Sequence, residues 1–361
     1  MNKLNLKSIQ IINASNRVSS VDFFRGLAIL AVVLYHYHYL LPFGNIGVDL
    51  FFVISGLLIG GLLTKDFNAD NKISYFKFIL QRGLKIWPSY YFFIIGGSVF
   101  AFFFLVNEQP LHLIPLNDIK RYLFFYQNYT GNTPHPAFEH VWSLCVEEHF
   151  YLVLPIMFIA VKAIFPKNIQ KTALYFLTIM VVLFGITAKY VSYTVFHLNT
   201  AVGTHNRIDA LAWGVLLNFI LIDFATFSKE TSVKITSVSL SSALLIISLW
   251  VLTYFDDGFY KQVVFHSLIP FVFFLLLFGC YFVDFSRFRI IQFIAYYSYN
   301  WYLWHFVFAF YFYYAFGDSF LGLLLYLVTS FLFAVAVTIV VEEFFLEKRK
   351  FIVNLFFPSK S

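Results

Sequence analysis

The chain has 361 residues, of which 60% are hydrophobic, 22% are aromatic and only 12% are charged. This composition excludes an ordinary soluble domain, and the lack of alternating hydrophobicity excludes a membrane β-barrel. The net charge of +6 could suggest nucleic-acid binding, but the cations lie mainly between apolar runs, where they set the orientation of a membrane protein. We therefore expect a lipid bilayer as the environment and no nucleic-acid partner.

Ten apolar runs are each long enough to cross a hydrocarbon core of about 30 Å. They predict an all-α membrane protein, a polytopic bundle of about ten transmembrane helices in one domain over residues 18–350, between polar tails at 1–17 and 351–361. Nineteen Lys and Arg lie in segments on the same side of the membrane as the N-terminus, and four lie in segments on the opposite side. Because positive charges are enriched in cytoplasmic segments, this asymmetry predicts cytoplasmic termini and a multi-pass protein of the cell membrane. The predicted spans are 24–41, 46–64, 87–106, 142–165, 171–196, 208–224, 236–255, 264–283, 291–316 and 319–345.

The first span carries two polar side chains, Arg25 and His36, in an apolar run. A charged residue inside a span costs roughly 2.5–3.5 kcal/mol on insertion scales, so it usually faces the interior of the bundle. Eleven positions separate the two residues, which is about three helical turns or about 16 Å. Both side chains are therefore expected on one face, whereas His38 should point to the opposite face.

Residues 73–88 interleave apolar and aromatic side chains with Lys77, Arg82 and Lys85. This pattern predicts an amphipathic helix at the cytoplasmic interface that ends at Pro88, before the third span. Two interpretations stay open for the three cations. They either anchor the helix to lipid headgroups or form a basic cradle for a phosphorylated ligand.

The fourth span opens with polar side chains, namely Ser143, Glu147, Glu148 and His149, after a long polar loop at 107–141. Such residues in a membrane helix are costly unless they line a polar cavity. Ser143 and Glu147 are four positions apart and share a face, whereas Glu148 points about 100° away. The pattern therefore predicts a cavity that Ser143 and Glu147 both reach.

Polar residues in the later spans also have structural explanations. Arg207 and Asp209 open the sixth span, and their position favours an ion pair at the outer membrane interface. His305 lies in the aromatic ninth span, where a polar side chain commonly forms hydrogen bonds between helices.

The predicted orientation separates a cationic group near the cytoplasm from a group of histidine and charged side chains farther out. An anionic donor could enter from the cytoplasm, and a neutral histidine suits general-base work at neutral pH. The cationic group is Arg25, Arg82 and Lys85, and the outer group is His36, Asp49, Glu147 and Arg207, with His305 between them.

These residues match a known pattern: over about residues 18–350 the chain resembles the acyltransferase 3 family of integral-membrane acyltransferases. Each motif alone is weak, but six of them occur in the family's order. They are VDFFRGLAILAVVLYH, GVDLFFVISGLLI, QRGLKIWPSYY, VWSLCVEEHFY, RIDALAWG and SYNWYLWH. Two positions depart from the family pattern, because Lys85 stands where a second Arg is usual and Arg349 replaces the proline of a closing Glu-Lys-Pro.

The resemblance implies an O-acetyltransferase that moves an acyl group, often acetyl from acetyl-CoA, to a hydroxyl of an extracytoplasmic polysaccharide or a similar carbohydrate acceptor. Acyl-CoA is then a donor substrate, with no tightly bound cofactor and no metal. By the same resemblance His36 is the catalytic residue, Arg25 its essential partner and Glu147 a support for the histidine or the acceptor, while Arg82 and Lys85 contact the CoA phosphates. The remaining candidates, with substrate-binding or supporting roles, are Asp49, Ser143, Arg207, Asp209 and His305.

Several alternatives remain at this point. Transfer can be direct, with the acceptor oxygen activated by His36, or it can pass through a covalent acyl-histidine. A glycan or lipid transporter without acyl transfer also explains buried charges along a polar path, but transporters often show paired broken helices, and the sequence has no such symmetry. A non-catalytic scaffold leaves Arg25, His36 and Glu147 without a reason.

Overall fold

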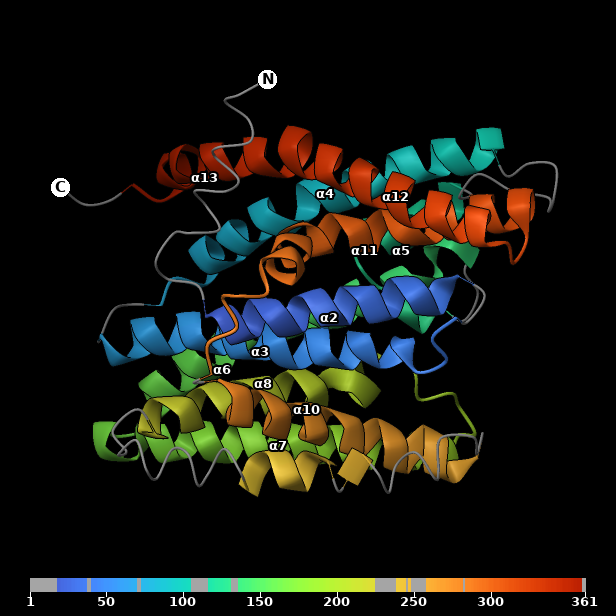
Figure 1. Ribbon diagram of the computed structural model, residues 1–361. Helices are drawn as coiled ribbons and strands as arrows, with labels where there is room; N and C mark the ends of the chain where they lie inside the picture. The colour runs from blue at the N-terminus through green and yellow to red at the C-terminus, as the bar shows by residue number, and fades with distance from the viewer. Residues whose placement is uncertain are drawn as a thin grey trace.

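The computed structural model describes residues 18–37, 40–69, 73–104, 116–130, 136–224, 238–244, 246–247, 258–281 and 283–358, and all regular elements in these ranges are helical. Within these described ranges, ten long helices form the body of the bundle (Figure 1). They are α2 (Ser19–His36), α3 (Gly47–Asn68), α4 (Tyr75–Phe104), α6 (Trp142–Ile164), α7 (Lys167–Thr194), α8 (Thr204–Phe224), α10 (His266–Cys280), α11 (Arg289–Phe316), α12 (Phe320–Val337) and α13 (Glu343–Phe356).

Short helical segments connect or extend these helices. Helix α5 (Leu116–Leu123) precedes two short 3-10 segments, and two π-helical segments are continuous with α10 and α12. The 3-10 segments are η1 (Gly44–Ile46), η2 (Gln127–Tyr129) and η3 (Pro136–Val141), and the π-helical segments are η4 (Tyr260–Phe265) and η5 (Thr338–Glu342).

The all-α membrane architecture predicted from composition is confirmed. In the part of the chain that the structure describes, six helical stretches are long and apolar enough to cross a membrane. The count of ten spans and the side of the termini remain predictions, and the predicted span 236–255 lies mostly outside the described residues. The six stretches are Ser19–His36, Gly44–Asn68, Phe138–Ile164, Lys167–Thr194, Tyr260–Cys280 and Phe320–Phe356.

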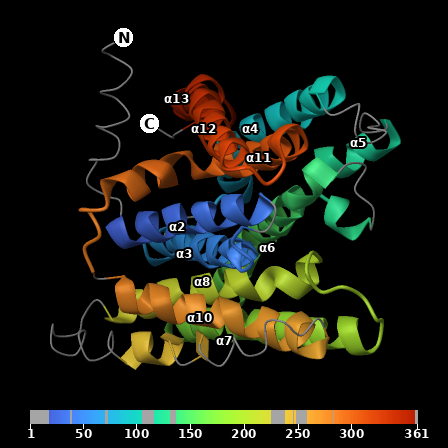
Figure 2. The ribbon, with the colours of Figure 1, turned by 45° about the vertical axis from the view of Figure 1, so that its right-hand side comes forward.

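Helices α2 and α3 form the centre of the bundle (Figures 1 and 2). Helices α4, α11 and α12 lie on one side of this pair, and α7, α8 and α10 lie on the other. Helix α11 packs along both α2 and α12, and α8 packs along both α3 and α7. Polar residues on α2 and α3 are therefore in the interior, where several helices can reach them.

Glycines allow α3 and α8 to approach very closely. A Cβ at Gly56 would lie 1.9 Å from the carbonyl oxygen of Leu211, and one at Gly214 would lie 2.0 Å from that of Val53. Small residues at such crossings are a common way for membrane helices to associate, because backbone packing replaces the missing hydrophobic drive. This contact fixes the register in which α3 and α8 present their polar residues to each other.

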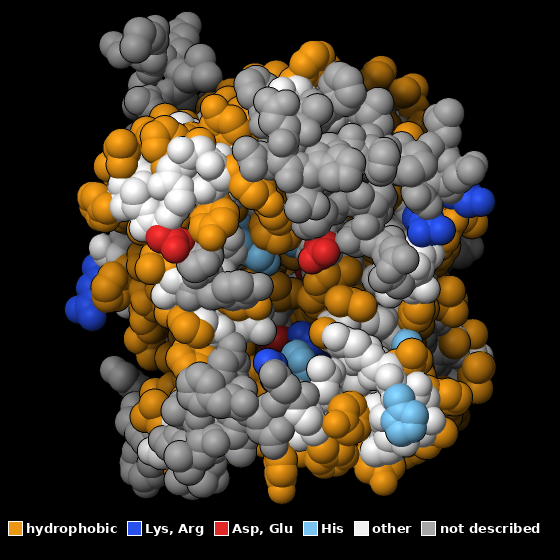
Figure 3. All heavy atoms as spheres, turned by 90° about the vertical axis from the view of Figure 1, so that its right-hand side faces the viewer, with side chains coloured by type: hydrophobic (Ala, Val, Ile, Leu, Met, Phe, Trp, Pro, Cys, Tyr) orange, Lys and Arg blue, Asp and Glu red, His pale blue; other side chains and the backbone are white. Residues whose placement is uncertain are grey.

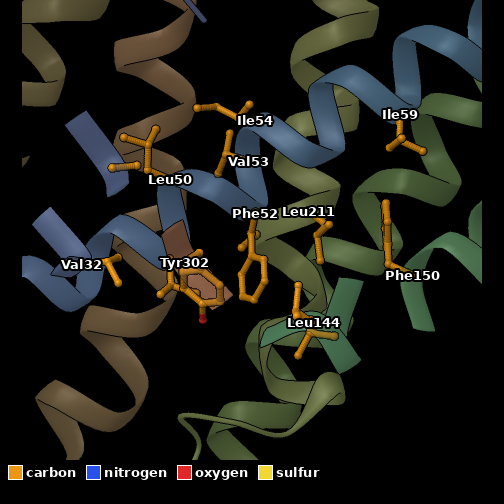
Figure 4. Packing of buried hydrophobic residues seen from close by; sticks show 14 of the residues in the cluster. Val32, Leu50, Phe52, Val53, Ile54, Ile59, Leu144, Phe150, Leu211 and Tyr302 are labelled. Carbon is orange, nitrogen blue, oxygen red and sulfur yellow. The ribbon is translucent and has the colours of Figure 1, made fainter. Parts of the chain in front are cut away.

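Around this crossing the interior is filled by apolar side chains from several helices. Figure 4 shows Phe52 of α3 between side chains of other helices, with Leu144, Leu211 and Tyr302 beside it. Phe52 is 1% exposed and Leu211 is fully buried. This packing holds the polar cavities described below between rigid walls.

Two predictions about helix ends are wrong. The interfacial helix 73–88 does not end at Pro88; it continues into the third span as the single helix α4. Prolines are more frequent in membrane helices than in soluble ones, and the Tyr299 hydroxyl of α11 joins this part of α4 to α11 by donating to the Ile86 carbonyl at 2.9 Å. At the other end of the chain, helix α13 continues to Phe356, through part of the segment expected to be a polar tail.

Candidate functional site

Two cavities lie between the central helices and share part of their walls. The first, called here the arginine cavity, has a volume of about 150 Å³, and the second, the histidine cavity, about 440 Å³. Val48 and Tyr302 line both. The arginine cavity contains Arg25, Arg82, Lys85, Ser143, Glu147 and Ser298, and the histidine cavity contains His36, Asp49, Gln127, Asn128, Arg207 and His266.

The histidine cavity lies at the end of the bundle where α2 ends and α3 begins. Figure 3 views this end and shows a hollow, with acidic, basic and histidine side chains in its depth. The three 3-10 segments η1, η2 and η3 each supply lining residues to the histidine cavity. The helices thus provide its floor, and short turns provide its rim.

The tautomer of His36 follows from a chain of contacts with His305. The Nδ1 atom of His305 lies 2.7 Å from the Tyr302 carbonyl oxygen, which can only accept, so this nitrogen carries the proton. In the neutral ring Nε2 of His305 is then an acceptor, and it lies 3.0 Å from Nδ1 of His36. Nδ1 of His36 also lies 3.0 Å from the Val32 carbonyl oxygen. Nδ1 of His36 therefore donates, and its Nε2 retains the lone pair that a general base needs.

The arginine cavity collects two guanidinium groups around one carboxylate. Arg25 donates to Ser298 Oγ at 3.3 Å, and the Arg82 guanidinium lies 4.8 Å from the centre of the Tyr151 ring. The Tyr151 hydroxyl donates to Glu147 at 2.8 Å, and Arg25 and Arg82 both interact electrostatically with this carboxylate. Glu147 was predicted in the outer group with His36, but it lies in the arginine cavity, because α6 directs Ser143 and Glu147 to that side.

Lys85 forms an ion pair with Glu342 of the π-helical segment η5. Glu342 is buried and also accepts from Asn300 Nδ2 at 2.7 Å. Sequence analysis missed Glu342 as a site residue, although a carboxylate inside a predicted span was the available signal. A π-helical turn is common at functional sites, and here it directs a buried acid toward a cation of the cavity wall.

The predicted ion pair between Arg207 and Asp209 at the outer interface is wrong in both its pairing and its exposure. Arg207 donates to Asp49 at 2.5 Å across the α3–α8 contact, and Lys189 of α7 donates to Asp209 at 2.5 Å. All four side chains are at most 3% exposed. Neighbouring positions on a helix point about 100° apart, so Arg207 and Asp209, two positions apart, face different partner helices.

The structure therefore divides the predicted site residues into three groups. One group lines the histidine cavity and a second lines the arginine cavity. The third group lines neither cavity: His305 contacts His36, and Asp209 pairs with Lys189. The first comprises His36, Asp49 and Arg207, and the second comprises Arg25, Arg82, Lys85, Ser143 and Glu147. Their catalytic and binding roles remain predictions.

The rim of the histidine cavity contains residues that sequence analysis missed. Asn45 lies in η1, Gln127 and Asn128 lie in η2, and Glu139 and His140 lie in η3. These segments are short and irregular, so they carry no periodic pattern that would assign their side chains to a face. Only the packing of the bundle brings them to one opening.

Comparison with known proteins gives a consistent picture. The model of a family described as acyltransferase domain matches residues 18–343. O-acetyltransferase OatA of Staphylococcus aureus is 27% identical over 237 residues in strain NCTC 8325 / PS 47 and equally in strain COL, covering 62% of this chain and 38% of each relative. The chain therefore matches well under half of the length of these relatives. No solved structure matches.

Proposed function

Because the chain belongs to the acyltransferase 3 family, we propose that it moves an acetyl group from cytoplasmic acetyl-CoA to a hydroxyl of an extracytoplasmic glycan or related acceptor. The observation that carries this proposal is the pair of cavities with a common wall at Val48 and Tyr302. One cavity has the cations that an anionic donor requires, and the other has the base that a hydroxyl requires. The proposal places the protein in the cell membrane with both termini on the cytoplasmic side, as the charge asymmetry predicts.

The arginine cavity is the proposed site for the phosphate-bearing part of acetyl-CoA. Arg82 is the cation best placed for this role, because its Nε atom is buried without a hydrogen-bond partner among the described residues. A guanidinium can bind a phosphate through two parallel hydrogen bonds. Lys85 already forms an ion pair with Glu342. Its ammonium group therefore donates to that carboxylate and to the phosphate at the same time.

The acyl end of the donor would then pass between Val48 and Tyr302 toward His36. The acceptor oxygen attacks the thioester carbonyl carbon, the new C–O bond forms, and Nε2 of His36 takes the hydroxyl proton. When the C–S bond breaks, the departing thiolate receives that proton, so the products are the acetyl ester and free CoA. His305 holds the His36 ring in the required tautomer throughout.

The test supplies radiolabelled acetyl-CoA to the cytoplasmic face of membrane vesicles that contain the full chain and follows the label into glycan on the opposite face. Vesicles with the protein should transfer label, and vesicles without it should not. Equal labelling in both would contradict the proposal. Uptake of glycan with no labelling would instead favour a transporter.

Replacing Arg82 by Met is expected to raise the KM for acetyl-CoA by roughly 10- to 100-fold, since a hydrogen bond to a charged group contributes about 1.5–3 kcal/mol. The KM for S-acetylpantetheine, which lacks the phosphates, should change little. Lys77→Met is the matched control, because Lys77 is an exposed cation on the same helix α4. An equal loss with both donors would show that Arg82 does not bind phosphate.

A further inference from the structure

Two buried amide side chains lie in the wall of the histidine cavity. In each, the NH₂ group is hydrogen-bonded and the amide oxygen has no partner among the described residues. Gln127 and Asn128 are 6% and 7% exposed. Gln127 donates from Nε2 to the Val141 carbonyl at 3.2 Å. Asn128 donates from Nδ2 to the Val202 carbonyl at 3.2 Å and to Thr204 Oγ1 at 2.9 Å. The oxygen of each amide is buried and has no hydrogen-bond partner among the described residues.

These contacts determine which way the two amides are oriented. A flipped amide would place its oxygen against the Val141 or Val202 carbonyl oxygen, and two acceptors repel each other. The NH₂ groups must therefore remain on the backbone, and the oxygens remain available as acceptors. A buried acceptor that is left unsatisfied costs roughly 1–3 kcal/mol, so such groups are normally paired in the functional state.

A third amide completes the pattern from another segment. Asn45 of η1 also lines the histidine cavity, and its Oδ1 atom is buried without a partner in the described part of the chain. Aromatic side chains of Trp142, Tyr302 and Phe306 line the same cavity. Among the described residues that line this cavity, Arg207 is paired with Asp49, and Glu139 is a further acidic side chain at the rim.

We infer that Asn45, Gln127 and Asn128 form a subsite that accepts hydrogen bonds from the hydroxyl groups of a neutral sugar unit. Two acceptors with a fixed orientation, at Gln127 and Asn128, and a third amide at Asn45 suit a ligand that offers several O–H donors on a compact ring, and aromatic faces suit the C–H surface of that ring. The cavity volume of about 440 Å³ falls within the range of about 300–1,000 Å³ that small-ligand sites have. This inference rests on the proposed function for the statement that the bound sugar is the acyl acceptor.

A site built to hydrogen-bond hydroxyls discriminates strongly against analogues that lack them, because its own polar groups are then left unpaired. The subsite therefore determines which sugar unit presents its hydroxyl to His36. The three amides contact the acceptor but not the reacting bond, so they are specificity-determining residues.

The test measures binding of two neutral tetrasaccharides, chitotetraose and cellotetraose, to the full chain in detergent by saturation-transfer NMR. At least one should bind the wild type, and Gln127→Met and Asn45→Ala should each weaken that binding about 3- to 10-fold, the effect of one lost hydrogen bond. Gln170→Met is the matched control: Gln170 is also tied by Nε2 to backbone carbonyls, of Lys162 and Phe165, but lies outside the cavity. Asn45→Ala removes no side-chain hydrogen bond among the residues that the structure describes, so it separates the subsite from a folding defect.

Label transfer from acetyl-CoA, measured on the same variants, separates this inference from the proposed function. Binding that the Gln127 and Asn45 variants weaken supports the sugar subsite even if the wild type transfers no label, in which case the acyl-transfer proposal alone fails. Binding by neither tetrasaccharide, or equal binding by wild type and both variants, overturns the subsite, including when label transfer is intact.

Discussion

Replacing His36 by Ala is expected to lower the rate of acetyl transfer by about 10²–10⁴-fold, the usual contribution of a positioned general base. Nε2 of this ring retains its lone pair only because Nδ1 donates to His305 and to the Val32 carbonyl. The alanine variant has no group at that position to take the proton of the acceptor hydroxyl.

The measurement is labelled-acetyl transfer in vesicles at equal protein level, with the KM for acetyl-CoA determined in parallel. That KM should stay near the wild-type value, because the cations proposed to bind the phosphates lie in the other cavity. His38→Ala is the control, because it removes a second imidazole two residues beyond His36, the last residue of α2; His38 itself lies outside the described residues. Equal activity in the wild type and His36→Ala would remove His36 from the mechanism.

Replacing Lys189 by Met is expected to destabilise the protein by about 3–5 kcal/mol, because it leaves the carboxylate of Asp209 buried without its cation. Lys189 is fully buried and Asp209 is 1% exposed. Gly185 makes room for this pair, since a Cβ there would lie 2.8 Å from the Asp209 Cβ.

Unfolding in detergent, followed by circular dichroism, measures this loss. The double variant Lys189→Met and Asp209→Leu should recover most of it, because removing both charges also removes their desolvation cost. Lys171→Met is the matched control on the same helix: its ion pair with Asp223 is 66% and 37% exposed, so its removal should cost at most about 1 kcal/mol. Similar destabilisation by Lys171→Met and Lys189→Met would contradict this account.

The buried pairs also explain how the site is positioned. The Asp49–Arg207 pair links α3 to α8 at the wall of the histidine cavity, and the Lys189–Asp209 pair links α8 to α7 behind it. Together with the glycine contact at Gly56, they give the three helices a fixed register. Rigid walls of this kind are what a site needs to hold reacting groups in place.

The sequence by itself determined the class of the fold and the family. Long apolar runs have to form helices in a membrane, because no water satisfies their backbone groups there. Periodicity also placed Arg25 and His36 on one face of α2 and brought Ser143 and Glu147 to one cavity, because helical geometry is local. The motif order indicated the acyltransferase family that the domain match confirms.

Only the tertiary structure decided which polar groups meet. The pairs Arg207–Asp49, Lys85–Glu342 and His36–His305 join helices far apart in the sequence, and the Lys189–Asp209 pair joins two consecutive helices. The continuation of α4 past Pro88 likewise could not be predicted from the local pattern. Local patterns give each side chain a direction on its own helix, but the depth and rotation of neighbouring helices, set by close packing, determine what lies opposite.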